Sequence, residues 1–257
     1  MVSPGSAREP ASATALIWIS GSRPASRGTI GRVAQARRRG SDDGLLRLPA
    51  RLPSLHDRWT RVWHGPGPAA EAGASEPLID VVREQHRRNF DLWHEEDQAR
   101  APGAGDAAIA GVKRRIDALN QERTDFTERL DEAVRERLER LRVRARSGAP
   151  WNSETPGAAI DRLSILSLRI YHMREEEERG DATEAHRAAC RVRRRILERQ
   201  RRDLLAALRW LIQDLLRGRK AMKTYRHYKM YNDPTLNPAI YRAPRPIGVR
   251  RGSKGAR

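Results

Sequence analysis

Apolar residues recur every three or four positions over long stretches of the chain, which is the spacing that gathers side chains on one face of an α-helix. This pattern predicts four long helices, over residues 76–99, 106–146, 156–179 and 182–217. Shorter helices are expected over 53–63 and 220–230, and Gly, Pro or Asn-Asp-Pro punctuates the boundaries. Because no segment alternates with the period of a strand, we expect an all-α fold, a helical bundle with flexible N- and C-terminal tails.

The segment 152–158, NSETPGA, has the composition of a helix start. Thr155 is suited to cap the helix, and Pro156 to occupy its first position, where a missing N–H costs nothing. The small residues Gly157 and Ala158 allow close approach to the helix N-terminus. The approaching group is expected to be either another helix or an anion.

Charge and length divide the 257 residues into three regions. Residues 1–50, with 8 basic and 3 acidic groups, are expected to be a disordered or misassigned extension. Residues 51–241 form a single all-α domain of unknown function, and 242–257 a flexible basic tail. The net charge is +18, and Arg187–Arg202 adds a basic stripe. Such charge attracts any polyanion, so it indicates nucleic-acid binding only weakly.

The single cysteine excludes an internal disulfide and fits a reducing compartment. No stretch approaches the ~18 apolar residues of a membrane span. We therefore expect a cytoplasmic protein.

Several polar side chains fall on the apolar stripes when each helix is stepped at 100° per residue. His86, Asp97, Arg100, Arg123 and Arg193 lie on stripes, and Asn89, His94 and Asn120 flank them. The helix over 156–179 is apolar around most of its circumference, with one polar sector holding Asp161, Arg162, Arg169 and His172. Because buried charges must be paired, neutralised or used, these residues predict either a hydrogen-bonded polar layer or a polar pocket.

The pocket interpretation has an anionic metabolite as its ligand, a nucleotide or sugar phosphate. Arginine forks suit phosphate oxygens, and the predicted binding residues are Asn89, Arg100, Asn120, Arg123, Asp161, Arg162 and Arg193. His94 and His172 are the candidates for proton transfer if the protein is an enzyme. Whether it is one stays open at this point.

A magnesium-dependent phosphoanhydride hydrolase is the alternative enzyme. All-α pyrophosphatases hold Mg²⁺ with Glu-rich helices, and oxygen ligands suit that ion. Here the ligands would be Glu96, Asp97, Asp117 and Asp131, although the Glu-rich motif is broken at Ala99.

The segment KTYRHYKMYNDPTLNPAIY interleaves tyrosines with basic residues. It is expected either to strap across the bundle with its tyrosine rings buried or to stack and charge-pair a nucleotide.

Five separated runs, LHDRWTRVWH, NFDLWHEEDQAR, IDALNQERTDFTERLD, NSETPGAAIDRLSILSLRIYHM and KMYNDPTLNPAIY, together resemble a bacterial family known only as domain of unknown function 4254. The resemblance runs from about Leu55 to Tyr241. It implies an accessory role in cell-envelope glycan synthesis, beside a glycosyltransferase-type protein partner. The family motifs also contain most of the inward polar residues, which favours a pocket.

Overall fold

A computed structural model describes residues 31–65, 76–228, 230, 233, 235–238 and 242, with only the backbone for 31–43. Five helices make up this part of the chain: α1 (Gly31–His64), α2 (Pro77–Ala99), α3 (Asp106–Arg140), α4 (Pro156–Glu178) and α5 (Glu184–Leu216). No strand occurs among the described residues, where the only β-bridge joins Trp151 and Ala221. The prediction of an all-α bundle is confirmed.

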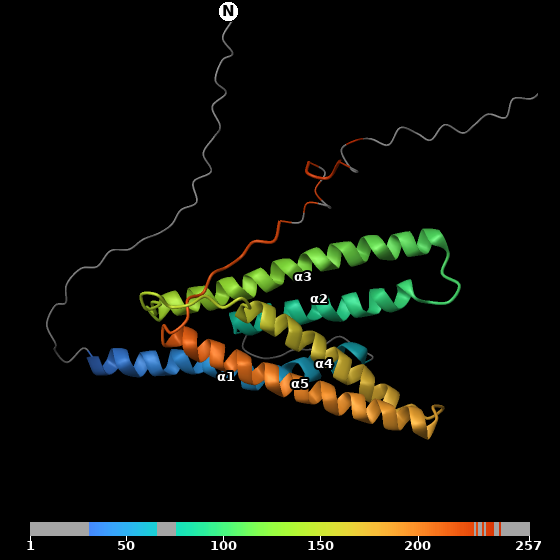
Figure 1. The fold of residues 1–257 in the computed structure, drawn as a ribbon, viewed down its shortest axis with the longest axis horizontal. Coiled ribbons are helices and arrows are strands. Elements are labelled where there is room, and N and C mark those ends of the chain that lie inside the picture. Colours follow the sequence, from blue (N-terminus) through green and yellow to red (C-terminus); the bar gives the residue numbers. More distant parts are fainter. Residues whose placement is uncertain are drawn as a thin grey trace, which may run out of the picture.

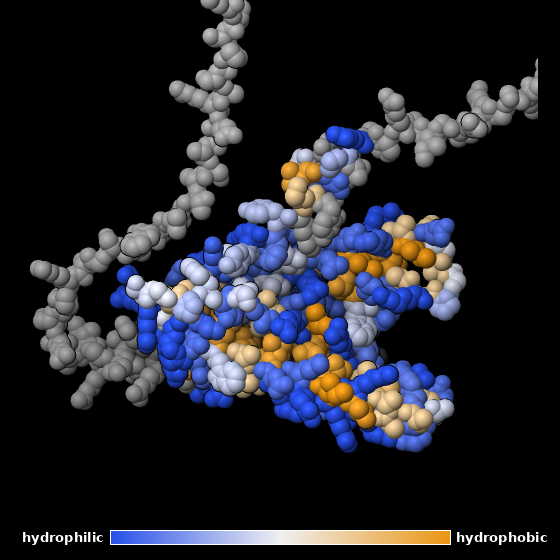
Figure 2. Space-filling model, in the orientation of Figure 1, coloured by the Kyte–Doolittle hydropathy of each residue, from blue (hydrophilic) through white to orange (hydrophobic). Residues whose placement is uncertain are grey.

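The helices are arranged as two antiparallel hairpins and one further helix (Figure 1). α2 pairs with α3 and α4 with α5, while α1 packs on α4 and α5. The loop ends of the two hairpins diverge on the right of the view. Figure 2 shows apolar side chains along these diverging ends, where Ile109 of α3 and Val192 and Ile196 of α5 are exposed.

The core forms where all five helices meet. Leu48 and Leu52 of α1, Leu130 of α3, Ile160 of α4 and Leu208 of α5 are all at most 1% exposed and belong to one buried cluster. A leucine buried this fully contributes about 1.5–3 kcal/mol relative to an exposed one. Val112, Ile116 and Leu130 recur at helical spacing along α3 and are buried, whereas Ile196 of α5 is 50% exposed.

α4 is the central helix, and its start is as predicted. Thr155 is the N-cap and its hydroxyl accepts a hydrogen bond from the Ala158 N–H (3.1 Å), with Pro156 at the first helical position. Its buried residues surround the helix: Pro156, Gly157, Ala159, Ile160, Asp161, Leu163, Ser164, Ser167, Leu168 and Ile170. Such all-round burial is typical of a helix inside a bundle.

Three predicted boundaries are wrong. Residues 31–50 were expected to be loop, but α1 begins at Gly31 and continues through Pro49 and Pro53 to His64. Burial of Leu45 and Leu48 outweighs the helix-breaking effect of proline here. α3 ends at Arg140 rather than 146, with Leu141 as its C-cap and Arg142 at a φ of 56°.

The third wrong boundary is the helix expected over 220–230. Residues 221–228 form instead an extended strap, which begins where the Ala221 N–H donates to the Pro150 carbonyl (3.0 Å). Residues 1–30 of the predicted N-terminal extension and residues 243–257 of the predicted C-terminal tail lie outside the described residues, as does Lys229. No helix in the described part of the chain has the length and apolar character needed to cross a membrane.

Candidate functional site

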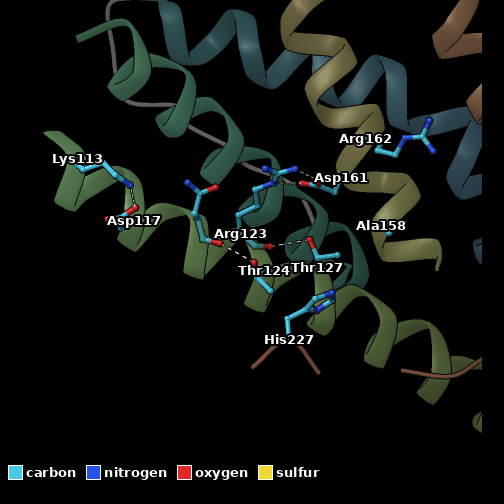
Figure 3. A pocket seen from close by; sticks show the side chains of 10 residues that line it. Lys113, Asp117, Arg123, Thr124, Thr127, Ala158, Asp161, Arg162 and His227 are labelled. Carbon is cyan, nitrogen blue, oxygen red and sulfur yellow. Dashed lines mark hydrogen bonds and ion pairs between the residues drawn. The ribbon is translucent and has the colours of Figure 1, made fainter. Parts of the chain in front are cut away.

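A groove of about 760 Å³ runs between α3 and α4 (Figure 3). Most of the residues that line it are polar or charged, and they are Lys113, Asp117, Asn120, Arg123, Thr124, Thr127, Ala158, Asp161, Arg162 and His227. Four of the predicted ligand-binding residues therefore share one cavity: Asn120, Arg123, Asp161 and Arg162.

An ion pair across the two helices forms the floor of this groove. Arg123 of α3 and Asp161 of α4 point at each other in Figure 3. Nε of Arg123 donates to Oδ1 of Asp161 (2.8 Å) and Nη2 donates to Oδ2 (2.5 Å), a two-pronged geometry that holds the guanidinium in one orientation. The bonds to Asp161 raise the pKa of Arg123 further, so it is charged at any physiological pH.

Asp161 is held from behind by buried amides on α2. Oδ1 accepts hydrogen bonds from Nε2 of Gln85 (2.5 Å) and Nδ2 of Asn89 (3.0 Å). Asp161 is only 8% exposed, and Gln85 and Asn89 are buried too. The carboxylate thus accepts hydrogen bonds from Arg123, Gln85 and Asn89, which compensate for its burial. Asn89 was predicted; Gln85, one turn earlier at the same face of α2, was missed.

The buried network continues from Asn89 into the core. Ser164 Oγ accepts from Nδ2 of Asn89 (2.9 Å) and lies 2.7 Å from Nδ1 of His86, whose Nε2 lies 2.9 Å from Oγ1 of Thr60. His56 stacks on His86 with ring centroids 4.4 Å apart. Burial lowers the pKa of His86 to about 3 and that of His56 well below its ordinary value. Both rings are therefore neutral at physiological pH.

The anion expected at the start of α4 is a side chain of α3. Oδ1 of Asp131 accepts a hydrogen bond from the Gly157 N–H (2.7 Å). Asp131 is buried, and burial raises the pKa of its carboxyl group while the bonds from Thr155 and Gly157 act in the opposite direction. A helix N-terminus favours a carboxylate in this position. The group that approaches the start of α4 is therefore both a neighbouring helix and an anion, because α3 carries the Asp131 carboxylate.

The strap 221–228 is anchored by a second buried carboxylate of α3, Glu128, which the sequence analysis missed. Its oxygens accept from the His227 N–H (2.7 Å) and from Nη1 of Arg226 (2.9 Å). Burial by itself would raise the pKa of Glu128, but these hydrogen bonds lower it below its ordinary value. Tyr225 and Tyr228, the two tyrosines of this segment that the structure describes, are 47% and 85% exposed, so these rings are not buried as the strap interpretation expected.

The carboxylates of the predicted magnesium site are not brought together. Asp131 caps α4, Asp117 pairs with Lys113, and Glu96 pairs with Arg100 (2.7 Å) while Asp97 is exposed. Asp117 and Asp131 are 14 positions apart on one helix, a distance of roughly 21 Å. Within the described residues, the one group of three or more potential metal ligands consists of histidines. The four carboxylates therefore do not form the single magnesium site that was predicted.

The remaining predicted residues are scattered around the groove. Arg162 points away from the ion pair in Figure 3 and binds Oε1 of Glu154 (2.6 Å). Arg100 is exposed and lines a neighbouring cavity of about 440 Å³, to which Asn89 and Arg123 also contribute. Arg193 is exposed on α5, outside both cavities.

His94 and His172 lie together but apart from the groove. Their ring centroids are 5.9 Å apart. On α4, His172 follows Asp161 by 11 positions, or about 16 Å. A phosphate group bound to Arg123 would therefore lie beyond direct hydrogen-bond reach of His172. The burial of His94 lowers the pKa of its imidazole, and the neighbouring His64 and His172 lower it further.

Comparison with protein families gives one result. The model of a family described as "Protein of unknown function (DUF4254)" matches residues 79–224, from α2 to the start of the strap. All of α1 and the segment after 224 lie outside this match, although the resemblance was expected to run from about Leu55 to Tyr241. No curated protein and no solved structure matches the chain.

Proposed function

The chain belongs to the family of proteins of unknown function DUF4254, and we propose that it binds a phosphate-bearing metabolite, a nucleotide or a sugar phosphate, in the groove between α3 and α4. The observation that carries the proposal is the fixed guanidinium of Arg123. Its pairing with Asp161 uses Nε and Nη2 and leaves Nη1 to a ligand. An anion that meets a donor already held in place loses little entropy on binding.

Charge at the rim supports the same ligand class. Lys113, Arg123 and Arg162 line the groove against two carboxylates, those of Asp117 and Asp161. Asn120, Thr124 and Thr127 add polar groups, and the strap contributes His227. Each of the three basic side chains is ion-paired, Arg162 with Glu154. The groove therefore offers N–H donors that bind phosphate oxygens beside carboxylates that bind hydroxyl groups, and a sugar phosphate or nucleotide carries both.

The competing interpretation is a polar layer that only sets the register of the helices. It requires the same bonds among Gln85, Asn89, Arg123 and Asp161, but no ligand. Ligand binding to variants at the rim separates the two, because rim residues make few contacts inside the bundle.

The test is thermal unfolding of the full chain with a panel of nucleotides and sugar phosphates, each with Mg²⁺ and with a chelator. A ligand at about 100 times its Kd adds about 2.7 kcal/mol, a shift of several degrees for a domain of this size. Lys113→Met, Arg162→Met and Arg123→Met should each reduce the shift, whereas Arg199→Met, on the exposed face of α5, should not. A panel without any shift, or a shift that survives the Arg123→Met and Arg162→Met changes, would overturn the proposal.

Binding of nucleic acid is the weaker alternative. Arg187, Arg191, Arg194 and Arg201 of the basic stripe are ion-paired with carboxylates of the same chain, so less of its charge is available to a phosphate backbone. A cytoplasmic location stays a prediction from the cysteine content and the hydropathy of the sequence. An accessory role in cell-envelope glycan synthesis and a glycosyltransferase-type partner stay predictions of the family resemblance.

A further inference from the structure

Three histidines from three helices converge near the loop ends of α2 and α4. They are His64 at the end of α1, His94 of α2 and His172 of α4, and one ligand nitrogen from each lies within 4.8 Å of the others. The ring centroids are 5.0 Å apart for His64 and His94, 5.2 Å for His64 and His172, and 5.9 Å for His94 and His172. The rings stand at 70–80° to one another, as imidazoles do when they point at a common centre.

Two of the rings are already oriented through their second nitrogen. Nδ1 of His64 lies 2.7 Å from the Thr60 carbonyl, and Nδ1 of His172 lies 2.7 Å from Oε2 of Glu175. Each Nδ1–H therefore donates to oxygen, which leaves the lone pair on Nε2. This is the arrangement of metal-binding histidines, whose outer N–H is held by a carbonyl or carboxylate.

The two Nε2 atoms are buried, and neither has a hydrogen-bond partner among the described residues. An unsatisfied buried acceptor costs about 1–3 kcal/mol. Both ring nitrogens of His86 in the core are paired, whereas those of the neighbouring His56 are not, so an unpaired nitrogen alone does not mark a ligand site. The cluster differs from His56 because its two unpaired Nε2 atoms come from different helices and belong to one group of three converging histidines.

Aromatic rings pack around the cluster and hold it in place, while each of the three histidines stays partly exposed. Tyr171 stacks on His64 (4.5 Å) and Trp93 stacks on His172 (4.6 Å, 9° between planes). Phe90 contacts the edges of His64 and His94 (4.8 and 4.5 Å). An apolar shell of this kind strengthens the interaction of nitrogen lone pairs with a cation.

We propose that His64, His94 and His172 bind one divalent transition metal ion, with a fourth position open to water or to a substrate. Three imidazoles suit Zn²⁺, Fe²⁺, Ni²⁺ or Cu²⁺ rather than Mg²⁺. Bonds of about 2.0–2.1 Å to a tetrahedral ion require ligand nitrogens about 3.4 Å apart. The ligand nitrogens now lie within 4.8 Å of one another, so binding requires the rings to move closer together. The site is independent of the anion groove.

The test uses the full-length chain without an affinity tag, stripped of metal with a chelator. Zn²⁺ is titrated by calorimetry and Co²⁺ by visible absorption. We expect one ion per chain with micromolar affinity or better, and the intense visible bands of four-coordinate Co²⁺. If neither ion binds at concentrations up to about 100 μM, the dissociation constant is that of a very weak site and the proposal is overturned.

Variants locate the site. His94→Gln and His172→Gln should each weaken binding at least about 100-fold, and Glu175→Gln by about 10–100-fold through the ring that it orients. The control is His186→Ala, because His186 lies near Cys190 and Glu176 (3.4 and 2.9 Å) and is the obvious place for adventitious metal. Circular dichroism checks that each variant is folded; if one histidine variant is not, the other and Glu175→Gln decide. Binding that is lost in His186→Ala, or retained in folded variants of the cluster, contradicts the proposal.

Discussion

At the scale of single residues, Asp161 has the largest number of roles. It binds Arg123 at the floor of the groove and accepts from Gln85 and Asn89 in the interior. It thereby joins α2, α3 and α4. Removing its charge would leave the half-buried guanidinium of Arg123 without its counter-ion. The free-energy penalty of that unpaired charge is larger than the net stabilisation that the ion pair provides.

We therefore expect Asp161→Asn to lower the free energy of unfolding by about 2–3 kcal/mol. Asp125→Asn is the matched control, since Asp125 is exposed and bonds only to Gln121 of its own helix, and it should change stability by less than about 0.5 kcal/mol. Urea denaturation measures both. Equal stability of the two variants would mean that the network does not support the fold.

The neutral histidine pair of the core predicts a pH dependence. His86 has a folded-state pKa of about 3, whereas in the unfolded chain it takes up a proton near ~6.5. Below pH ~6.5 the unfolded state binds more protons than the folded state. The contribution of neutral His86 to the free energy of unfolding is therefore fully present above this pH and decreases as the pH falls toward 3. Between pH 7.5 and 5 the loss is about 2 kcal/mol from His86, and His56 acts in the same direction.

Urea denaturation at several pH values tests this expectation, with His86→Asn as the comparison. The variant cannot titrate at this position. The slope of its unfolding free energy against pH should therefore correspond to about one bound proton less than in the wild type. A pH slope identical in both proteins would show that His86 is not the group responsible.

At the scale of elements, the contact between α3 and α4 depends on one residue without a side chain. A Cβ added at Gly157 would lie 2.4 Å from the Thr127 carbonyl oxygen and 2.9 Å from Oδ1 of Asp131. The carbonyl is part of the α3 backbone and cannot move alone. The capping of α4 by Asp131 therefore requires glycine at this position.

Gly157→Ala should lower the free energy of unfolding by about 2–3 kcal/mol, because α4 must move away from α3. Gly111→Ala provides the opposite case, since its Cβ would make an ordinary 3.7 Å contact with Nη1 of Arg115. That change should stabilise the protein by about 0.5–1 kcal/mol through helix propensity. Thermal or urea unfolding of both variants measures the difference. If Gly157→Ala is also stabilising, the two helices do not pack as described.

At the scale of the whole molecule, α1 belongs to the folded domain although half of it precedes the predicted boundary at residue 51. Leu45 and Leu48 are 2% and 1% exposed in the common core. The domain must therefore begin before residue 45.

Two truncated chains test this boundary. A chain that begins at residue 44 keeps both leucines and should match the stability of the full-length protein. A chain that begins at residue 51 loses about 3–6 kcal/mol of apolar burial, together with the first half of α1. Urea denaturation compares the two, and equal midpoints would place the boundary after these leucines.

The sequence alone determined the all-α class, the positions of α2 to α5 and the cap at Thr155, because helix periodicity and capping depend on neighbouring residues. It also indicated Asn89, Arg123 and Asp161 as inward groups. The missed start of α1 carried a usable signal, since Leu45, Leu48, Leu52 and Leu55 have helical spacing. Pro49 and Pro53 argued against a continuous helix, because proline is unfavourable inside a helix.

Only the tertiary structure decided which polar groups meet. Asp131 caps α4 instead of binding a metal ion, because α4 begins beside it. Arg193 is exposed on α5, near the end where the two hairpins diverge. His64 joined His94 and His172 from the far end of a helix. Periodicity fixes the face of a helix on which a side chain lies, but the neighbour that this face meets depends on how the helices cross, which no local pattern encodes.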